Sequence, residues 1–303
     1  MAVENGMRLR AKLARECGAQ VLVGLVGTGI QRSLSPDMHM AEAKAQGLQL
    51  DYQLIDVDGA DATPQTLDSV LKCARELGFS GLNITYPFKQ LVFPLLDGLA
   101  DSARSMGAAN TVVFEHKTQK AVGHNTDGSG WRMGFERDLP NADLTRVVLL
   151  GAGGAGSAIA HSLCAMGCGS LVLVDADASR AQALKQQLER RACATAVTVE
   201  ADAECALVGA SGLVHATPTG MDKLPGMPMS GKLLHSGLWV SEVVYFPLDT
   251  ALLRAARALG CKSSDGGGMA VGQALGAFAL FTGLQANQQR VRMHFESLVK
   301  AAR

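Results

Sequence analysis

A glycine-rich segment between two apolar runs constrains the fold of this 303-residue chain more than any other feature. The run Val147–Leu150 leads into Gly151-Ala-Gly-Gly-Ala-Gly156, and a second apolar run, Leu171–Val174, ends at Asp175. In G-x-G-x-x-G spacing, the first glycine permits a tight turn and the second lets a pyrophosphate approach the backbone. The third lets a helix pack on a strand. The segment therefore predicts a strand–turn–helix unit that binds a dinucleotide.

The residues around this turn favour a ligand-binding role. A helix expected to begin at Ala155 would offer backbone N–H groups and the positive end of its dipole to phosphates. Asp175 stands where an acid accepts hydrogen bonds from an adenosine ribose. The alternative is a glycine turn of an α/β sheet that binds no ligand. The strands on both sides and the acid favour the dinucleotide site.

Composition limits the class of protein. Lys plus Arg and Asp plus Glu each number 28, so no whole-chain charge points to nucleic acid or a membrane surface. The length suggests two domains, and 48% hydrophobic residues with 34 glycines are typical of a compact α/β enzyme. The seven cysteines are scattered, and Cys164 and Cys168 have no second pair or histidine cluster beside them. We therefore expect no metal site and a reducing, cytoplasmic setting.

Two segments need to be distinguished from targeting or membrane sequences. Met7–Cys17 is basic, but no long apolar region follows, so we expect a short surface helix and no signal peptide. Gly266–Gln289 carries no charge, yet its apolar part, Met269–Leu284, is shorter than the ~20 residues that a membrane helix needs. We expect a buried helix there.

Alternating strands and helices predict a mainly parallel sheet in the first part of the chain. The strands expected there are Val21–Val26, Leu50–Val57, Gly81–Thr85, Ala108–Phe114 and Lys120–Gly123. A second βα series starts near Asn141. Its strands beyond the glycine turn are expected at Leu171–Val174, Thr195–Val199, Gly212–Ala216, Leu238–Tyr245 and Lys262–Ser264. Two helices follow the last strand and could return to the first domain, which would make that domain discontinuous.

Two polar clusters precede helices of the first domain. Ser33 and Ser35 could both face one ligand, or Ser35, before a proline, could simply cap a helix. Asn83, Thr85 and Lys89 stand where a parallel strand ends, which is the usual ligand edge of an open α/β sheet. A lysine in a first helical turn opposes the helix dipole, so either an anion lies near Lys89 or its side chain is solvated.

Four further residues carry polar chemistry. Asn110 and Asp127 flank a predicted hairpin, where both residue types also occur for conformational reasons alone. Asp127 would gain a function if it lay near Lys89, because the two could hold and ionise an alcohol. Tyr245 follows a buried strand and either reaches a ligand or anchors the strand end. Gln273 lies on an apolar helix, where a buried amide needs hydrogen-bond partners.

Taken in order, these clusters resemble the shikimate/quinate dehydrogenase family over roughly residues 21–285. The matching motifs are Ser33-Leu-Ser-Pro36, Asn83-Ile-Thr-x-Pro-x-Lys89, Gly107-Ala-x-Asn-Thr111, Asn125-Thr-Asp127, Gly151-Ala-Gly-Gly-Ala-Gly156, Ala216-Thr-Pro-x-Gly-Met221, Tyr245-x-Pro247 and Gly272-Gln273. The resemblance implies an α/β fold with two domains. Residues 1–126, completed by C-terminal helices at 269–303, would bind substrate, and residues 127–268 would form a Rossmann NAD-binding domain. The active site would lie in the cleft between them.

The resemblance also implies roles for individual residues. Lys89 and Asp127 would be the catalytic pair, close together across the cleft. The groups that would hold the hydroxyls and carboxylate of a cyclohexene acid are Ser33, Ser35, Asn83, Thr85, Lys89, Asn110, Asp127, Tyr245 and Gln273. The residues that would bind the cofactor are Gly151, Gly153, Gly154, Ala155, Gly156, Asp175, Arg180, Thr217, Pro218, Gly220, Met221, Val243, Gly266 and Met269.

Several positions depart from the family pattern. The family often has Asn where His215 stands, and Pro, His and Asn where Gly29, Arg32 and Met40 stand. Its NADP-dependent members usually have Asn-Arg-Thr after the second Rossmann strand, whereas this chain has Asp175-Ala-Asp-Ala-Ser-Arg180. Two carboxylates there repel a 2′-phosphate and accept the ribose hydroxyls of NAD. NAD is therefore the expected cofactor, and NADP is the less favoured one because Arg180 is also present.

The expected activity is the interconversion of shikimate and 3-dehydroshikimate, a reaction of aromatic amino acid biosynthesis. Quinate is expected as a further substrate. One alternative is a paralogue that acts on a substituted shikimate, since Gly29, Arg32 and Met40 border the substrate cluster. Another is a catalytically silent dinucleotide-binding sensor, against which Lys89 and Asp127 argue. The expected partner is a small molecule of the shikimate/quinate class, with no nucleic acid and no membrane, and a homodimer stays open.

Overall fold

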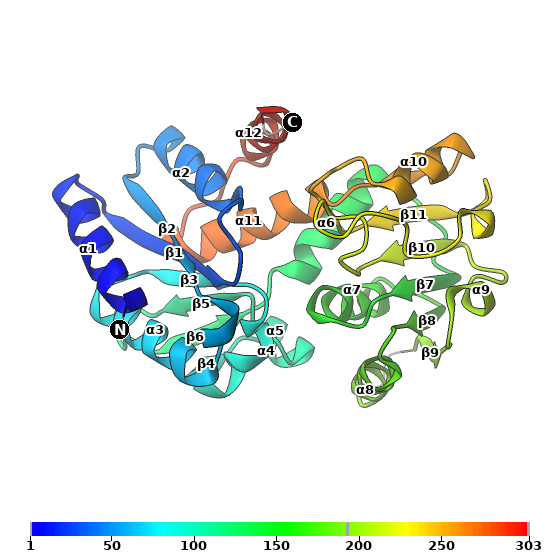
Figure 1. Ribbon diagram of the computed structural model, residues 1–303, viewed down its shortest axis with the longest axis horizontal. Helices are drawn as coiled ribbons and strands as arrows, with labels where there is room; N and C mark the ends of the chain where they lie inside the picture. Colours follow the sequence, from blue (N-terminus) through cyan, green and yellow to red (C-terminus); the bar gives the residue numbers. More distant parts are fainter. Residues whose placement is uncertain (1, 192–193, 302–303) are drawn as a thin grey trace. The chain divides into compact units, whose positions relative to one another are not determined.

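The computed structural model describes residues 2–191 and 194–301, and its chain forms two compact units. The first is Met1–Thr126 with Gln273–Arg303, and the second is Asp127–Gly272. Each unit has its own six-stranded sheet (Figure 1). The return boundary that we expect from the sequence, between residues 268 and 269, and that of the structure both fall inside one helix, α11 (Gly267–Thr282).

The sheet of the first unit is mixed, in the order β2-β1-β3-β5-β6-β4. Its strands are β1 (Val21–Gly27), β2 (Leu50–Asp56), β3 (Gly81–Ile84), β4 (Gly98–Leu99), β5 (Thr111–Phe114) and β6 (Ala121–His124). The pairs β1–β2 and β1–β3 are parallel, as expected of alternating strands and helices, while β5 pairs antiparallel with β3 and β6. Strand β4, which the sequence did not indicate, pairs parallel with β6.

Helices cover both faces of this sheet. They are α1 (Ala2–Glu16), α2 (Ser35–Ala45), α3 (Pro64–Glu76), α4 (Phe88–Leu91), α5 (Asp101–Met106), α11 and α12 (Gln288–Ala301), with short 3-10 turns at Gly59–Asp61 and Phe93–Leu95. Met7 of α1 and Leu67 of α3 belong to the core on one face. Ala277 and Phe281 of α11 pack on the other face against Val23. The end of the chain therefore returns to complete the first unit.

The sheet of the second unit is entirely parallel, in the order β12-β11-β10-β7-β8-β9. Its strands are β7 (Arg146–Leu150), β8 (Ser170–Val174), β9 (Ala196–Val199), β10 (Gly212–His215), β11 (Trp239–Glu242) and β12 (Ser263–Ser264). Its helices are α6 (Asp127–Asp138), α7 (Gly154–Ala165), α8 (Ala178–Glu189), α9 (Ala203–Ala206) and α10 (Ala251–Ala258), with a 3-10 turn at Gly231–Leu233. The strand order reverses direction between β7 and β10. Ligands bind at the carboxyl ends of the strands at such a switch point.

Alternate residues of each central strand serve opposite faces of this sheet. Val147 and Leu149 pack with Ile159 of α7, while Val148 and Leu150 pack with Leu253 of α10. Because helices cover both faces, the strand is apolar throughout and shows no polar alternation. This is the physical reason for the continuous apolar run before the glycine turn.

Helices α6 and α11 touch backbone to backbone within the second unit. A Cβ atom added to Gly134 would lie 2.7 Å from Cα of Gly268, and one added to Gly272 would lie 2.6 Å from Cα of Gly130. Four glycines, spaced i, i+4 on each helix, therefore make an approach that no larger residue permits. The remainder of α11 is mostly apolar, and its residues are partly or fully buried, with Val271 and Phe278 among the fully buried ones. In the described part of the chain, no helix has both the length and the apolar character needed to cross a bilayer.

His39 of α2 should make the stability of the protein sensitive to acid. It is buried among aromatic rings, and burial lowers its pKa from 6.5 to about 3. Between these two pH values the unfolded chain binds more protons than the folded one. Stability should therefore fall as the pH drops from 6.5 towards 3, by up to ~1.4 kcal/mol per pH unit for one proton. His39→Phe should flatten that slope in denaturant unfolding measured across this range.

The exposed His116 provides the matched control. His116→Phe should leave the slope unchanged. Some slope should remain in His39→Phe, because desolvation also lowers the pKa of His161, to about 4. An equal slope in the wild-type and His39→Phe proteins would show that His39 is not the group that couples folding to pH.

Candidate active site

The glycine turn has the geometry that its spacing predicts. Gly151 follows β7 with φ +101°, a conformation that favours glycine. A Cβ on Gly156 would lie 1.9 Å from the carbonyl oxygen of Gly151, so this position also requires glycine. A Cβ on Gly153 would meet no protein atom within 4 Å. Gly153 is the N-cap of α7 and provides no side-chain cap, so the helix N-terminus is suited to an anion.

Alanine at two of these glycines should separate ligand binding from folding. Gly153→Ala should keep the melting temperature of the wild type, because its backbone is extended and its surroundings in the protein are open. It should weaken dinucleotide binding, since its methyl group enters the space that a pyrophosphate would use. Gly156→Ala should instead lower the melting temperature by forcing the turn away from α7. Calorimetry of binding and thermal unfolding of both variants test this. Equal effects of the two substitutions on stability would contradict it.

The acidic segment after β8 is tied to the glycine turn. One oxygen of Asp175 accepts a hydrogen bond from the backbone N–H of Ala152 at 2.7 Å, and the other accepts from the N–H of Asp177 at 2.9 Å. Asp177 caps α8 by accepting from the hydroxyl and the N–H of Ser179, and these hydrogen bonds, the hydroxyl's above all, lower the pKa of the Asp177 carboxyl. The guanidinium of Arg180 lies 3.4 Å from Asp177 in an exposed ion pair. Asp175 is thus held at the turn, and Arg180 has a carboxylate partner.

The loop after β10 lies against the same turn. The Cγ2 atom of Thr217 would be 3.0 Å from a Cβ on Gly151, and the side chain of Ala216 approaches Gly156. The loop continues through Pro218 to Gly220, which has φ +99°, and to the partly exposed Met221.

The end of β11 and the start of α11 approach each other closely. A Cβ on Gly266 would lie 2.3 Å from the carbonyl oxygen of Val243. Met269 is buried and packs in the same core cluster as Val243. Tyr245 lies two residues after Val243, and burial raises the pKa of its phenol. Three predicted cofactor residues thus lie together, at the carboxyl edge of the second sheet.

A polar network in the first unit brings together several predicted substrate residues. The hydroxyl of Tyr52 donates to Oδ1 of Asn83, whose Nδ2 donates to Oγ1 of Thr111 at 3.0 Å. Oδ1 of Asn110 accepts from the N–H of Thr126, and its Nδ2 donates to Oγ1 of Thr126.

The same network reaches α11 and the junction with the second unit. The hydroxyl of Thr126 also donates to the backbone carbonyl of Gln273 at 3.3 Å. Asn125 donates to the carbonyl of Ala108. Because the hydroxyl of Thr111 donates to Oδ1 of Asn110, the side chains of Asn83 and Asn110 and the backbone carbonyl of Gln273 belong to one hydrogen-bonded cluster, which fixes the strand ends where the chain leaves the first unit.

The remaining predicted substrate residues lie in loops and short helices. Helix α2 begins at Ser35, as expected, and its N-cap is Leu34, so of the two alternatives for Ser35 the structure excludes capping. Ser33 accepts a hydrogen bond from the N–H of Ser35. The methyl group of Thr85 packs on the backbone of β1.

The two predicted catalytic residues lie in the first turns of two helices. Lys89 lies in the single turn of α4 and is partly buried. Asp127 is the first residue of α6 and is fully buried. A carboxylate at a helix N-terminus is stabilised by the dipole, whereas a lysine there is not.

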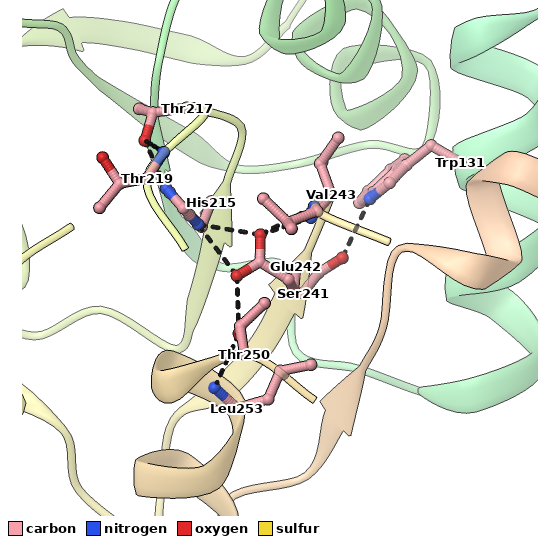
Figure 2. A network of polar contacts seen from close by, with 10 residues as sticks. Trp131, His215, Thr217, Thr219, Ser241, Glu242, Val243, Thr250 and Leu253 are labelled. Carbon is pink, nitrogen blue, oxygen red and sulfur yellow. Dashed lines mark hydrogen bonds and ion pairs between the residues drawn. The ribbon is translucent and has the colours of Figure 1, made fainter. Parts of the chain in front are cut away.

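Sequence reasoning missed a buried acid, Glu242, which closes a network with His215 (Figure 2). The indication was present, because Glu242 is the only charged residue in the apolar run from residue 238 to 245. Within residues 2–191 and 194–301, no three or more His, Cys, Asp or Glu side chains are grouped to hold a metal ion. The six cysteines described are free thiols, and Cys193 lies outside the described residues.

A doubly wound parallel sheet with a glycine turn at its switch point, joined to a second α/β unit, defines a two-unit protein of the dinucleotide-binding class. Residues 25–112 match the family model described as shikimate dehydrogenase substrate binding domain, and residues 133–195 match the ThiF family.

The similarity to curated relatives extends over nearly the whole chain. The chain is 52% identical to a shikimate dehydrogenase (NADP(+)) of Streptomyces avermitilis, over 93% of this chain and 97% of the relative. It is 47% identical to a quinate/shikimate dehydrogenase (NAD(+)) of Corynebacterium glutamicum, over 92% and 99%. The solved quinate dehydrogenase of Corynebacterium glutamicum in complex with NAD aligns with a TM-score of 0.85 at 45% identity, over 92% and 100% of the two chains. The chain belongs to the shikimate/quinate dehydrogenase family.

Proposed function

We propose that this protein is an oxidoreductase that interconverts shikimate and 3-dehydroshikimate by hydride transfer with a nicotinamide cofactor, and that quinate is a further substrate. The observation that carries the proposal is the full-length similarity to relatives named for these two activities. The glycine turn at the switch point and the hydrogen-bonded cluster of Asn83, Asn110 and Gln273 support it from the structure.

Lys89 and Asp127 are the proposed catalytic residues. Hydride loss from an alcohol carbon requires that the hydroxyl proton leaves in the same process. A bound nicotinamide ring would take up or return the hydride. The ammonium group of Lys89 would stabilise negative charge that develops on the substrate oxygen. Asp127 would hold the hydroxyl by hydrogen bonding, and one of the two residues would accept the hydroxyl proton and return it in the reverse reaction.

The other polar groups are proposed to recognise the substrate. A cyclohexene acid with several hydroxyls and one carboxylate requires donors and acceptors at fixed positions. We assign that role to Ser33, Ser35, Asn83, Thr85, Asn110, Tyr245 and Gln273. Binding by rigid side chains suits such a substrate, because the polar network in the first unit already fixes Asn83 and Asn110.

A steady-state screen tests the activity. Shikimate and quinate are each combined with NAD and with NADP, and the reduced cofactor is followed by its absorbance. We expect turnover of shikimate and slower or equal turnover of quinate. Tight cofactor binding without turnover of either acid would contradict the proposal and favour a non-catalytic dinucleotide-binding protein.

NAD should be preferred over NADP in kcat/KM. The carboxylate of Asp175, held at the glycine turn, would repel a 2′-phosphate and accept ribose hydroxyls. Arg180, the group that could bind that phosphate, is paired with Asp177. Asp175→Asn should lower the ratio of kcat/KM with NAD to kcat/KM with NADP about tenfold, because it removes one charge while keeping one acceptor oxygen. The control is Asp68→Asn, which removes one negative charge from a surface position. A wild-type enzyme that is faster with NADP would show that Arg180 outweighs Asp175.

A further inference from the structure

A fully buried histidine and glutamate lie side by side at the carboxyl ends of β10 and β11. Nδ1 of His215 is 2.9 Å from Oε1 and 3.0 Å from Oε2 of Glu242, and both side chains are excluded from solvent (Figure 2). Burying an ionisable pair removes both groups from water, which is costly unless each polar atom finds a partner.

The groups around Glu242 determine the direction of these hydrogen bonds. Oε1 of Glu242 accepts from the backbone N–H groups of Val243 and Val244. Oε2 faces the hydroxyl of Thr250, which accepts from the N–H of Leu253 and donates to Glu242. Both oxygens are therefore acceptors, and Nδ1 of His215 must donate the remaining hydrogen bond. The imidazole ring is thus fixed in orientation.

The second ring nitrogen of His215 fixes Thr217. Nε2 of His215 is hydrogen-bonded to Oγ1 of Thr217, which also accepts from the N–H of Thr219. The Cγ2 methyl group of Thr217 lies against Gly151, the first glycine of the nucleotide turn. The hydroxyl of Thr217 is therefore held by His215, and its methyl group packs on Gly151. These contacts fix the loop after β10 at the switch point of the sheet.

We propose that His215 and Glu242 are positioning residues for the cofactor, which act by fixing Thr217 against the glycine turn. This inference rests on the proposed function, because it assigns the pair to the nicotinamide cofactor of the same site. The pair acts on the cofactor surface of the second unit and not on the groups that recognise the acid. Its loss should therefore change cofactor binding while leaving the KM for shikimate close to that of the wild type.

Two substitutions at Thr217 separate the hydrogen bond from the packing. Thr217→Val keeps both branches of the side chain but removes the hydroxyl that meets His215. Thr217→Ser keeps the hydroxyl and removes the methyl group that lies on Gly151. Since a hydrogen bond contributes ~1 kcal/mol, Thr217→Val should weaken NADH binding about fivefold to tenfold. Thr217→Ser should bind NADH more tightly than Thr217→Val, because it keeps the hydrogen bond to His215.

A third variant tests the pair without creating a cavity. In Glu242→Gln the amide oxygen can still accept from Val243 and Val244, while its NH₂ group must donate to Nδ1 of His215. The histidine then donates from Nε2, which reverses the hydrogen bond to Thr217. We expect this variant to weaken NADH binding by less than Thr217→Val does, because the hydrogen bond to Thr217 is reversed and not removed. Thr198→Val, on exposed β9 of the same unit, is the control.

The experiment measures the NADH dissociation constant of the complete protein by fluorescence, together with its melting temperature and the KM for shikimate. The inference is supported if Thr217→Val and Glu242→Gln weaken NADH binding, Thr217→Ser binds NADH more tightly than Thr217→Val, and Thr198→Val leaves NADH binding unchanged. It is overturned if binding is unchanged in the first two, whatever their melting temperatures. It is also overturned if Thr217→Ser binds NADH as weakly as Thr217→Val does, since loss of packing alone would then explain the weaker binding. NADH binding needs no turnover, so a protein that binds NADH but does not oxidise shikimate would refute the proposed function alone.

Discussion

Replacing Lys89 by methionine should lower kcat by ~10²–10⁴-fold with a much smaller change in KM. Methionine keeps the length of the side chain and removes the charge that we propose to stabilise oxygen in the transition state. Asp127→Asn should have an effect of similar size, because it keeps the shape and removes the negative charge. An interaction that strengthens as charge develops lowers kcat more than it raises KM. Steady-state kinetics with saturating cofactor measure both constants.

The double variant provides the sharper measurement. If Lys89 and Asp127 act on the same hydroxyl, the double variant should be scarcely slower than the slower single variant. Lys72→Met, on the exposed surface of α3, is the matched control and should keep normal kcat. Multiplicative losses, or a Lys89→Met enzyme with near-normal kcat, would mean that the two residues bind substrate and do not take part in the chemistry.

Gly272→Ala should destabilise the protein by ~1–3 kcal/mol, the usual effect of overpacking. The added methyl group would lie 2.6 Å from both Cα and the carbonyl oxygen of Gly130, so α6 and α11 would have to separate. Backbone atoms cannot move aside as the end of a long side chain can. Denaturant unfolding of the purified variant measures the loss.

Gly6→Ala is the matched control for this change, because Gly6 also lies inside a helix, α1, but has open space around it. The nearest atom to its added methyl group is 3.8 Å away, in the flexible side chain of Arg10. Alanine there should stabilise the protein by ~0.5–1 kcal/mol, since it restricts the unfolded chain. If both variants stabilise the protein, helix propensity and not the α6–α11 contact decides the outcome.

The parts of the fold that local chemistry dictates could be predicted from the sequence. The glycine turn is the clearest case, because a positive φ at Gly151 and the close approach at Gly156 each allow only one residue type. Strand β4 could not be predicted, since Gly98–Leu99 is two residues long and exists only through pairing with β6. Whether Ser35 caps α2 or is its first residue could not be decided from the sequence, because a serine before proline suits both positions.

In the candidate site too, the sequence could identify some residues but not the contacts that join distant strands. Asn83 and Asn110 could be identified as polar residues at strand ends, but not the hydroxyl of Tyr52 that fixes Asn83, because that contact joins strands far apart in sequence. His215 was noticeable as a departure from the family pattern. Its partner Glu242 was not, since an acid in an apolar run can be read as a strand end until β10 and β11 are seen to pair.

The glycine contact between α6 and α11 also bears on the order in which the chain folds. Gly130 and Gly272 lie near the two ends of the segment Asp127–Gly272, so the start and the finish of that segment touch. To the first unit, the whole segment is a loop that must close before Gln273–Arg303 can join Met1–Thr126, and closing a long flexible loop costs entropy. Once the inserted unit has folded, its own contact has already closed that loop. The first unit can then fold as if its two pieces were joined by a short connection.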